Sequence, residues 1–185
     1  HQQKFDVAIL EVGLGGRLDA VNVVDADVSI VVSVDLDHQA YLGNTRELIG
    51  HEKAHIYRAG RPAIFADSDP PQSLLDYAAA IRADLRLFNR DFRFRRMDGQ
   101  WQFFGRDSAR HALPFPALRG NYQLKNASAA LAALEGTNAS AIIVARPAAS
   151  LGEIVGDLFP RLVFSGLIGV AAALVVEGLA AEGRG

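Results

Sequence analysis

Short, continuous runs of β-branched and other apolar residues limit this chain to a fold with buried strands. Residues 5–12 form the first run, residues 28–34 the second and residues 62–66 the third. Strands of a parallel sheet are covered on both faces, so they read as continuous apolar runs rather than as alternating ones. Helix-like segments alternate with these runs. We therefore expect an α/β fold with a mostly parallel sheet flanked by helices.

Three segments are expected to be helices. Residues 44–58 form the first, with Asn44 as its cap and Glu47 three residues later, as in a capping box. Residues 70–83 form the second, which opens on two prolines that the first turn of a helix tolerates. Residues 121–135 form the third, which is rich in alanine. Each of these segments is long enough to cover part of a sheet.

Two further strands are expected at residues 85–94 and 100–104, with a turn at Asp98-Gly99. Beyond residue 136 the composition changes, and Ala, Val, Gly and Leu dominate. The uncharged stretch 162–176 is shorter than the roughly 20 residues that a membrane-spanning helix needs. We therefore expect one domain over 1–135 and an apolar tail over 136–185, either a buried helix or disordered, and no membrane span.

Composition limits the classes of partner that this chain can be expected to bind. The net charge is −2 and the pI is about 6.2, whereas nucleic-acid binders usually carry a basic stripe, so we expect no nucleic acid. The chain has no cysteine, which excludes disulfides and thiolate metal sites and is compatible with the cytoplasm. It begins His1-Gln2-Gln3-Lys4 with no initiator Met and no signal-peptide pattern, which we interpret as a truncated end.

Two side chains that can bind metal follow the first two apolar runs. Glu11 closes the first run, and His38 comes shortly after the second. Ligands of open α/β sheets bind at the carboxyl ends of the strands, so one edge could hold both residues. Magnesium takes oxygen ligands and tolerates an occasional imidazole. Taken singly, each residue could equally be structural, but together they predict a magnesium site.

Lys53 lies on the helix expected at residues 44–58, and two interpretations are open. It could be an ordinary exposed helical lysine. Alternatively, it could be buried near the metal, held neutral and carbamylated by carbon dioxide, since burial disfavours a charged amine. The carbamate would be an anion able to help hold a second magnesium ion.

The glycines of residues 13–18 resemble a dinucleotide-binding fingerprint only superficially. That motif needs a third glycine where Leu18 stands and a helix directly afterwards. A second apolar run follows instead. The glycines therefore indicate a tight turn or a close approach of the backbone to another group.

Two more motifs bear on chemistry. His51, Glu52 and His55 satisfy the H-E-x-x-H pattern, in which two histidines on one helix face bind zinc and the glutamate acts as general base. The extended form of that motif needs a histidine where this chain has Arg61, so a zinc metallohydrolase is kept as an alternative. At the start of the alanine-rich helix, an amide side chain could bond an adenine edge or simply cap the helix.

The segments Leu10–Ala20, Asp37–Gly43, Glu52–Ile56 and Gly120–Ala127 together resemble the dihydrofolate synthase/folylpolyglutamate synthase family of the Mur-ligase superfamily. The resemblance covers about residues 4–135 and implies part of a central ATPase domain. By position it implies the following roles: Glu11 and His38 as magnesium ligands, Lys53 as the carbamylated lysine, Arg17, Leu18, Asp19 and Ala20 at the pterin substrate, and Gln123 and Asn126 at ATP.

The resemblance also implies a reaction. ATP phosphorylates the carboxylate of dihydropteroate or folate, and the amine of L-glutamate displaces phosphate from that acyl phosphate. Magnesium neutralises phosphate charge and orients the reacting groups. The implied partners are therefore small molecules, and the parent family is typically monomeric. The sequence does not distinguish a dihydrofolate synthase from a folylpolyglutamate synthase.

One part of the family pattern has no counterpart in this chain. The phosphate loop Gly-Thr-x-Gly-Lys-Gly-Ser does not occur, and the only lysines are Lys4, Lys53 and Lys125. We therefore expect the isolated chain to be inactive. A non-catalytic remnant that binds a partner is the other alternative, and apolar surface left uncovered would favour self-association.

Overall fold

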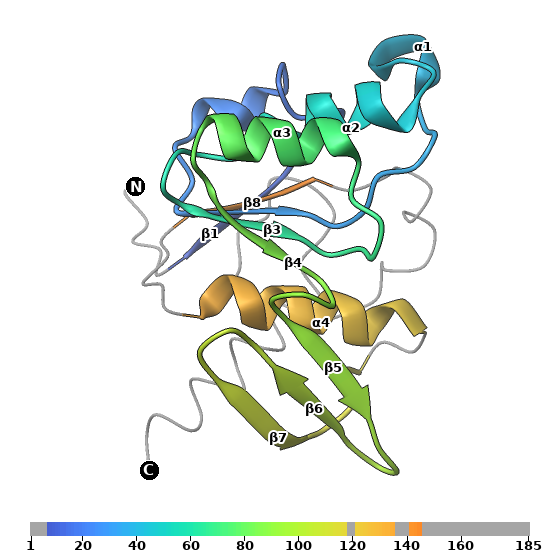
Figure 1. Ribbon diagram of the computed structural model, residues 1–185, viewed down its shortest axis with the longest axis vertical. Coiled ribbons are helices and arrows are strands. Elements are labelled where there is room, and N and C mark those ends of the chain that lie inside the picture. The colour runs from blue at the N-terminus through green and yellow to red at the C-terminus, as the bar shows by residue number, and fades with distance from the viewer. Residues whose placement is uncertain (1–6, 118–120, 136–140, 146–185) are drawn as a thin grey trace, which may run out of the picture.

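The computed structural model describes residues 7–117, 121–135 and 141–145. Its centre is a five-stranded sheet in which every neighbouring pair is parallel, as expected (Figure 1). In sheet order, the strands are β1 (Ala8–Glu11), β8 (Ala141–Ala145), β2 (Val28–Val31), β3 (Pro62–Phe65) and β4 (Asp84–Leu87). The three apolar runs of the sequence therefore supply β1, β2 and β3, each shorter than its run.

Helices α2 (Arg46–Ala54) and α3 (Gln72–Ala80) cover one face of this sheet (Figure 1). Ile49 and Leu74, one from each helix, are fully buried in the same apolar core as Val31 and Phe65 of the sheet. Two shorter elements, η1 (Ala20–Val23) and α1 (Gln39–Leu42), connect the strands to this layer. Continuous burial of the β2 strand on both faces explains its unbroken apolar sequence.

The start of α2 corrects the expected cap. Thr45, not Asn44, is the N-cap, and its Oγ1 accepts a hydrogen bond from the Leu48 backbone N–H at 3.2 Å. Glu47 instead accepts from the backbone N–H groups of Gln72 at 3.1 Å and Ser73 at 2.7 Å, where α3 begins. The Ser73 N–H bond lowers the pKa of Glu47. Glu47, which was expected to cap its own helix α2, therefore caps the start of α3.

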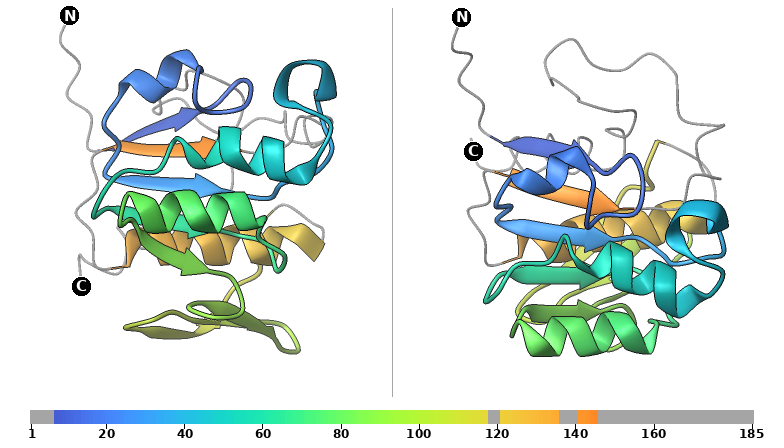
Figure 2. Two further views of the ribbon diagram at one scale, coloured as in Figure 1. Left: turned by 45° about the horizontal axis from the view of Figure 1, so that its top comes forward. Right: turned by 90° about the horizontal axis from the view of Figure 1, so that it is seen from above.

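Helix α4 (Asn121–Leu134) covers the opposite face of the sheet and is itself covered by a second, antiparallel sheet (Figures 1 and 2). The small sheet consists of β5 (Arg93–Arg96), β6 (Trp101–Phe104) and β7 (Ala109–Leu113). Because α4 lies between two sheets, it is buried nearly all round, and small side chains let both sheets approach it. This position accounts for its alanines, of which Ala127, Ala129, Ala132 and Ala133 are almost fully buried.

The single strand expected over residues 85–94 is wrong. The chain leaves the main sheet after Leu87 and enters the small sheet at Arg93. Between them Asn89 adopts a left-handed backbone (φ 67°), and its N–H donates to Phe92 O at 2.8 Å. Asparagine tolerates this conformation better than most residues. The turn expected at Asp98-Gly99 is present, with Gly99 at φ 71°.

Strand β8 lies within the segment that composition assigned to the apolar tail. It pairs in parallel with β1 on one side and with β2 on the other, so the main sheet continues beyond residue 135. Val12 N–H donates to Val144 O and Val32 N–H donates to Ala145 O, both at 2.9 Å. Residues 146–185, including the apolar stretch 162–176, lie outside the described residues. Within the part that is described, no helix is long and apolar enough to cross a membrane.

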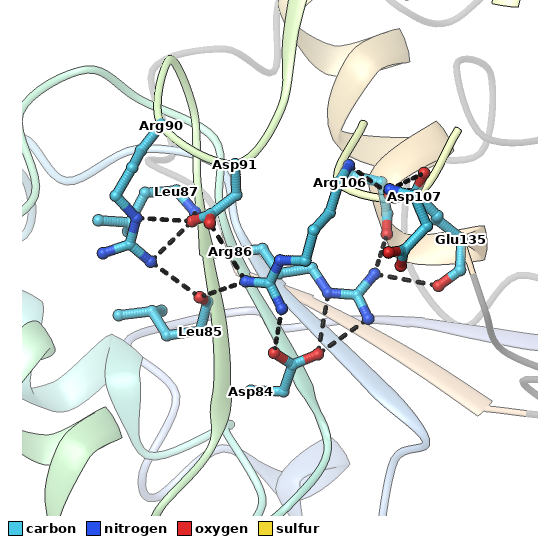
Figure 3. Close-up of polar contacts among 10 residues, drawn as sticks. Asp84, Leu85, Arg86, Leu87, Arg90, Asp91, Arg106, Asp107 and Glu135 are labelled. Atoms are coloured by element: carbon cyan, nitrogen blue, oxygen red, sulfur yellow. Dashed lines mark hydrogen bonds and ion pairs between the residues drawn. The ribbon is translucent and has the colours of Figure 1, made fainter. Parts of the chain in front are cut away.

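Charged side chains join α4, β4 and the small sheet (Figure 3). Arg86 is 7% exposed and donates to Asp84 and to the Ala132 and Glu135 carbonyls at the end of α4. Arg106, in the turn between β6 and β7, donates to Asp84 at 2.6 Å and to Asp91 at 3.2 Å. Two arginines thus share the Asp84 carboxylate and connect three elements.

The Glu135 carboxylate is hydrogen-bonded to the turn between β6 and β7. It accepts from the backbone N–H groups of Arg106 at 3.0 Å and Asp107 at 3.1 Å, and from Ser108 Oγ at 2.7 Å. Partial burial raises the pKa of Glu135, but these hydrogen bonds outweigh it and the net pKa is lowered. The pKa of Asp84 is lowered in the same way, since bonds from Arg106 and Arg86 outweigh its burial. Both carboxyl groups are therefore stabilised in the ionised form by folding.

We predict that this network makes the domain sensitive to acid. A carboxyl pKa that is lowered by folding contributes stability above the unfolded-state pKa and loses it as the pH falls through the folded-state pKa. The free energy of unfolding should therefore fall between about pH 5 and pH 3, and less steeply in Asp84→Asn/Glu135→Gln. Urea unfolding across this pH range measures it, with Asp98→Asn in an exposed turn as the control. Equal slopes in the double variant and the wild type would contradict the prediction.

Candidate functional site

Polar residues follow three of the parallel strands at their carboxyl ends. Glu11 is the last residue of β1, and its Oε2 atom is buried. Asp37 and His38 follow β2, and Asp67 follows β3. Carboxyl ends of parallel strands face one edge of the sheet, which is where ligands bind in open α/β folds. Glu11 and His38 therefore follow parallel strands that end at one edge of the sheet, with β8 lying between these two strands; that they share a metal site stays a prediction.

His38 stands in an unusual backbone conformation. Its φ is 48° and its ψ is 40°, in the left-handed region, directly before α1. The Asp37 carboxylate accepts from the His38 backbone N–H at 2.8 Å and lies 3.8 Å from Nε2. Arg46 of α2 donates to the Val34 carbonyl at 3.1 Å, which fixes the start of the same loop. Left-handed non-glycine residues occur mainly where surrounding contacts hold them, often at functional sites.

Lys53 is buried on α2, with only 3% of its surface exposed. The interpretation of Lys53 as an ordinary exposed lysine is therefore wrong. Its Cα is also close to the glycine loop, because a Cβ built on Gly16 would lie 3.2 Å from it. Lys53 thus belongs to the layer directly beneath that loop. Its carbamylation stays a prediction.

The glycine loop rests on the last turn of α2. Arg17 N–H donates to the Glu52 carbonyl at 3.0 Å, and Arg17 Nε donates to the Glu52 carboxylate at 2.8 Å. A Cβ on Gly16 would lie 2.8 Å from the Glu52 carbonyl oxygen, closer than real contacts allow. Glycine is therefore required here for a close backbone approach, as the sequence indicated.

Asp19 organises the loop from within. Its Oδ2 accepts from the N–H groups of Gly13 at 2.9 Å and Leu14 at 3.1 Å, and its Oδ1 accepts from Val21 N–H at 3.0 Å, capping η1. By contrast, Leu18 is 82% exposed beside it. The structure thus assigns Asp19 a role in holding the loop. The substrate contacts predicted for Arg17, Leu18, Asp19 and Ala20 stay predictions.

The start of α4 lies at the same edge. Lys125 Nζ donates to Asp67 at 2.9 Å, which ties this helix to the end of β3. Lys125 also lies 5.4 Å from the ring centre of Tyr122, which is 72% exposed. Gln123 and Asn126, on the same turns, are half-buried. Sequence reasoning missed Asp67 and Lys125, although Asp67 follows an apolar run as Glu11 does.

The zinc alternative gains no support. Glu52 is engaged by Arg17, and His55 Nδ1 lies 2.7 Å from the His51 carbonyl oxygen. The His55 ring stacks on Tyr77 with centroids 4.1 Å apart. Residues 7–117, 121–135 and 141–145 contain no group of three His, Cys, Asp or Glu side chains placed to hold a metal ion. A third protein ligand for zinc is therefore missing from this region.

Magnesium needs fewer protein ligands than zinc does. It usually keeps several waters and binds through one or two carboxylates together with substrate phosphates. The buried carboxylate of Glu11 and the imidazole of His38, with phosphate oxygens from a nucleotide, fit that pattern without a third protein ligand. The donor set at this edge is thus compatible with a magnesium–nucleotide complex.

The parallel sheet, the helices on its two faces and the polar edge define a Mur-ligase-like α/β domain. The chain is 44% identical over 133 residues to dihydrofolate synthase/folylpolyglutamate synthase of Escherichia coli (strain K12), and 40% identical over 134 residues to that of Haemophilus influenzae. Each match covers 72% of this chain. No family model matches the chain.

Solved structures agree with these relatives. The bifunctional folylpolyglutamate synthase/dihydrofolate synthase from Yersinia pestis, complexed with AMPPNP and Mn ion, superposes with a TM-score of 0.64 at 45% identity, over 71% of this chain and 31% of that one. E. coli FolC in complex with DHPP and ADP gives a TM-score of 0.63 at 39% identity, over 71% of this chain and 31% of that one. This chain belongs to the dihydrofolate synthase/folylpolyglutamate synthase family. It spans about a third of the length of the curated relatives it matches, 30% and 31% for the two above.

We predict that Gly16→Ala separates the loop from α2. The new methyl group must displace the Glu52 backbone, so the free energy of unfolding should fall by about 1–3 kcal/mol. Gly13→Ala is the matched control, because its Cβ would meet only Asp19 Oδ2 at 3.4 Å, an ordinary contact. Thermal unfolding of both variants measures the difference, and equal melting temperatures would contradict the requirement for glycine at position 16.

Proposed function

We propose that the protein to which this segment belongs is an ATP-dependent ligase that adds L-glutamate to dihydropteroate or folate in the cytoplasm. The observation that supports the proposal is that Glu11, His38 and Asp67, which pairs with Lys125 of α4, follow the carboxyl ends of parallel strands, with buried Lys53 under the adjoining loop. The ligands are proposed from the family's members, since relatives have been solved with ADP, with AMPPNP and Mn ion, and with L-glutamate.

Each residue has a distinct task in this proposal. Glu11 and His38 hold magnesium, which supplies positive charge to the phosphates of ATP when bound. Lys53, once carbamylated, provides a further anionic ligand from beneath the loop. Gln123 and Asn126 contact ATP from α4. Asp19 keeps the glycine loop closed on α2, so that Leu18 is presented to the pterin ring.

The reaction then proceeds in two displacements. A carboxylate oxygen of the pteroate or folate attacks the γ-phosphorus of ATP, the bond to the β-phosphate oxygen breaks, and ADP leaves. The amine of L-glutamate attacks the acyl carbon, loses a proton and expels inorganic phosphate. The protein's main contribution is to hold the reacting groups in place and to stabilise charge that develops during transfer.

We predict that Glu11→Ala weakens metal-dependent nucleotide binding. Calorimetric titration of magnesium-ATP, with and without dihydropteroate, should show binding by the wild-type chain that is at least tenfold weaker in Glu11→Ala, because a buried carboxylate that meets the metal is lost. Asp25→Ala is the control, since Asp25 is exposed and its carboxylate pairs only with Arg58 in the described part of the chain. Binding that needs no magnesium, equal binding in Glu11→Ala, or none by a folded chain would overturn the site assignment.

We also propose that the isolated 185-residue chain does not catalyse ligation. In the described part of the chain, Lys53 lies on helix α2 and Lys125 lies on helix α4, where it pairs with Asp67, so neither belongs to a phosphate-cradling loop; Lys4 lies outside the described residues. Purified chain incubated with ATP, dihydropteroate and L-glutamate should therefore release no more ADP than a blank. Glutamate-dependent ADP release lost in Glu11→Ala would refute the proposal.

A further inference from the structure

The three strands of the small sheet carry an unusual set of charges. Their sequences, RFRR, WQFF and ARHAL, contain four arginines and a histidine but no acidic residue. The nearest acidic residues in sequence, such as Asp98 and Asp107, lie in the turns. The strands are therefore locally basic in a chain whose net charge is −2.

Arginine is used differently here from elsewhere in the described part of the chain. In the rest of the domain most arginines lie against carboxylates; these are Arg17, Arg46, Arg58, Arg61, Arg86, Arg90 and Arg106. On β5, by contrast, the Arg93 guanidinium lies 4.9 Å and that of Arg95 5.8 Å from the ring centre of Phe104. Neither makes an ion pair with a carboxylate that the structure describes.

These residues share the face of the small sheet that is turned away from α4. Phe94 and Phe103, paired across β5 and β6, pack towards α4, and side chains alternate along a strand. Arg93 and Arg95 therefore point outwards, and both are exposed. The ring of His111 lies edge-on at 5.9 Å from Phe104 and borders them. We call Arg93, Arg95, Phe104 and His111 the arginine face; it belongs to the sheet seen below α4 in Figure 1.

Stacking on an aromatic ring leaves the edge of a guanidinium open. That edge carries N–H donors in a planar fork that matches a carboxylate, and stacking holds the fork in place before a ligand arrives. The two guanidinium Cζ atoms lie 4.9 Å and 5.8 Å from the same ring centre, so they are at most about 11 Å apart. A γ-linked glutamate chain has one free carboxylate per residue, and its extended repeat, estimated from standard bond lengths, is about 6 Å. Carboxylates of neighbouring residues in such a chain fall within that span, so two of them can meet the two arginines.

We propose that the arginine face binds a γ-linked polyglutamate chain. The proposal rests on the proposed function, whose product carries such a chain. Charge complementarity favours it, because the face offers donors and positive charge without a competing carboxylate on its strands. A single-stranded nucleic acid fits less well, since its bases need open aromatic faces and both arginines lie against the Phe104 ring.

The test is a titration of fluorescently labelled γ-linked hexaglutamate into the 185-residue chain at low salt. Arg93→Gln/Arg95→Gln should weaken binding at least tenfold, and added salt should weaken wild-type binding, because the contacts are exposed ion pairs. Arg82→Gln is the matched control: Arg82 is also exposed and lacks a carboxylate partner among the described residues, but it lies outside the small sheet. Circular dichroism confirms that each variant is folded.

Several outcomes would overturn the proposal. They are no binding by the folded wild type, an equal loss in Arg82→Gln, and binding of α-linked hexaglutamate or single-stranded RNA at least as tight as that of the γ-linked probe. The titration contains neither ATP nor magnesium, so Glu11→Ala should bind the probe like the wild type. A failure of nucleotide binding would therefore be distinguishable from a failure of the arginine face.

Discussion

The double pairing of β8 is the constraint on which the rest of the domain depends. β1 and β2 follow each other in the chain but are not neighbours in the sheet, and β8 forms backbone hydrogen bonds with both. Without it, two inner strand edges would present unpaired N–H and C=O groups in the middle of the core. Ala145 at its end is fully buried in the core beneath α2 and α3. The polar edge, in which Glu11 and His38 follow the flanking strands, therefore has its width set by a strand from far along the chain.

This dependence explains where the sequence was sufficient and where it was not. The runs that became β1, β2 and β3 were predictable because burial on both faces leaves a local, continuous apolar pattern. The Ala-Ile-Ile-Val-Ala of β8 has the same pattern, but the surrounding Ala- and Gly-rich composition hid it, and its partners are more than 100 residues away. The division between β4 and β5 depends on one left-handed residue, Asn89, whose conformation no apolar pattern records.

The candidate site divides along similar lines. Glu11 and His38 could be proposed as site residues because they follow recognisable strands, and Lys53 because its helix and its neighbours resemble a known family. The pairing of Asp67 with Lys125 could not, because two residues 58 positions apart leave no local signal. Nor could the sequence show that Asp19 bonds three backbone N–H groups of its own loop. A carboxylate beside a predicted substrate segment can support the segment rather than touch the substrate.

Arginines have two different roles around the small sheet: some hold it on α4, and others are exposed on its outer face. Arg86 and Arg106 form ion pairs with Asp84 and Asp91, and Arg86 also binds the end of α4. Truncating Asp84 would leave the charge of buried Arg86 uncompensated. Such bonds are directional, so they fix how the sheet lies on α4, whereas apolar contacts of Trp101 and Phe103 alone would tolerate sliding. Once that orientation is fixed, the alternation of β5 leaves only one direction for Arg93 and Arg95, away from the helix. Arg86 and Arg106 thereby determine which way Arg93 and Arg95 face.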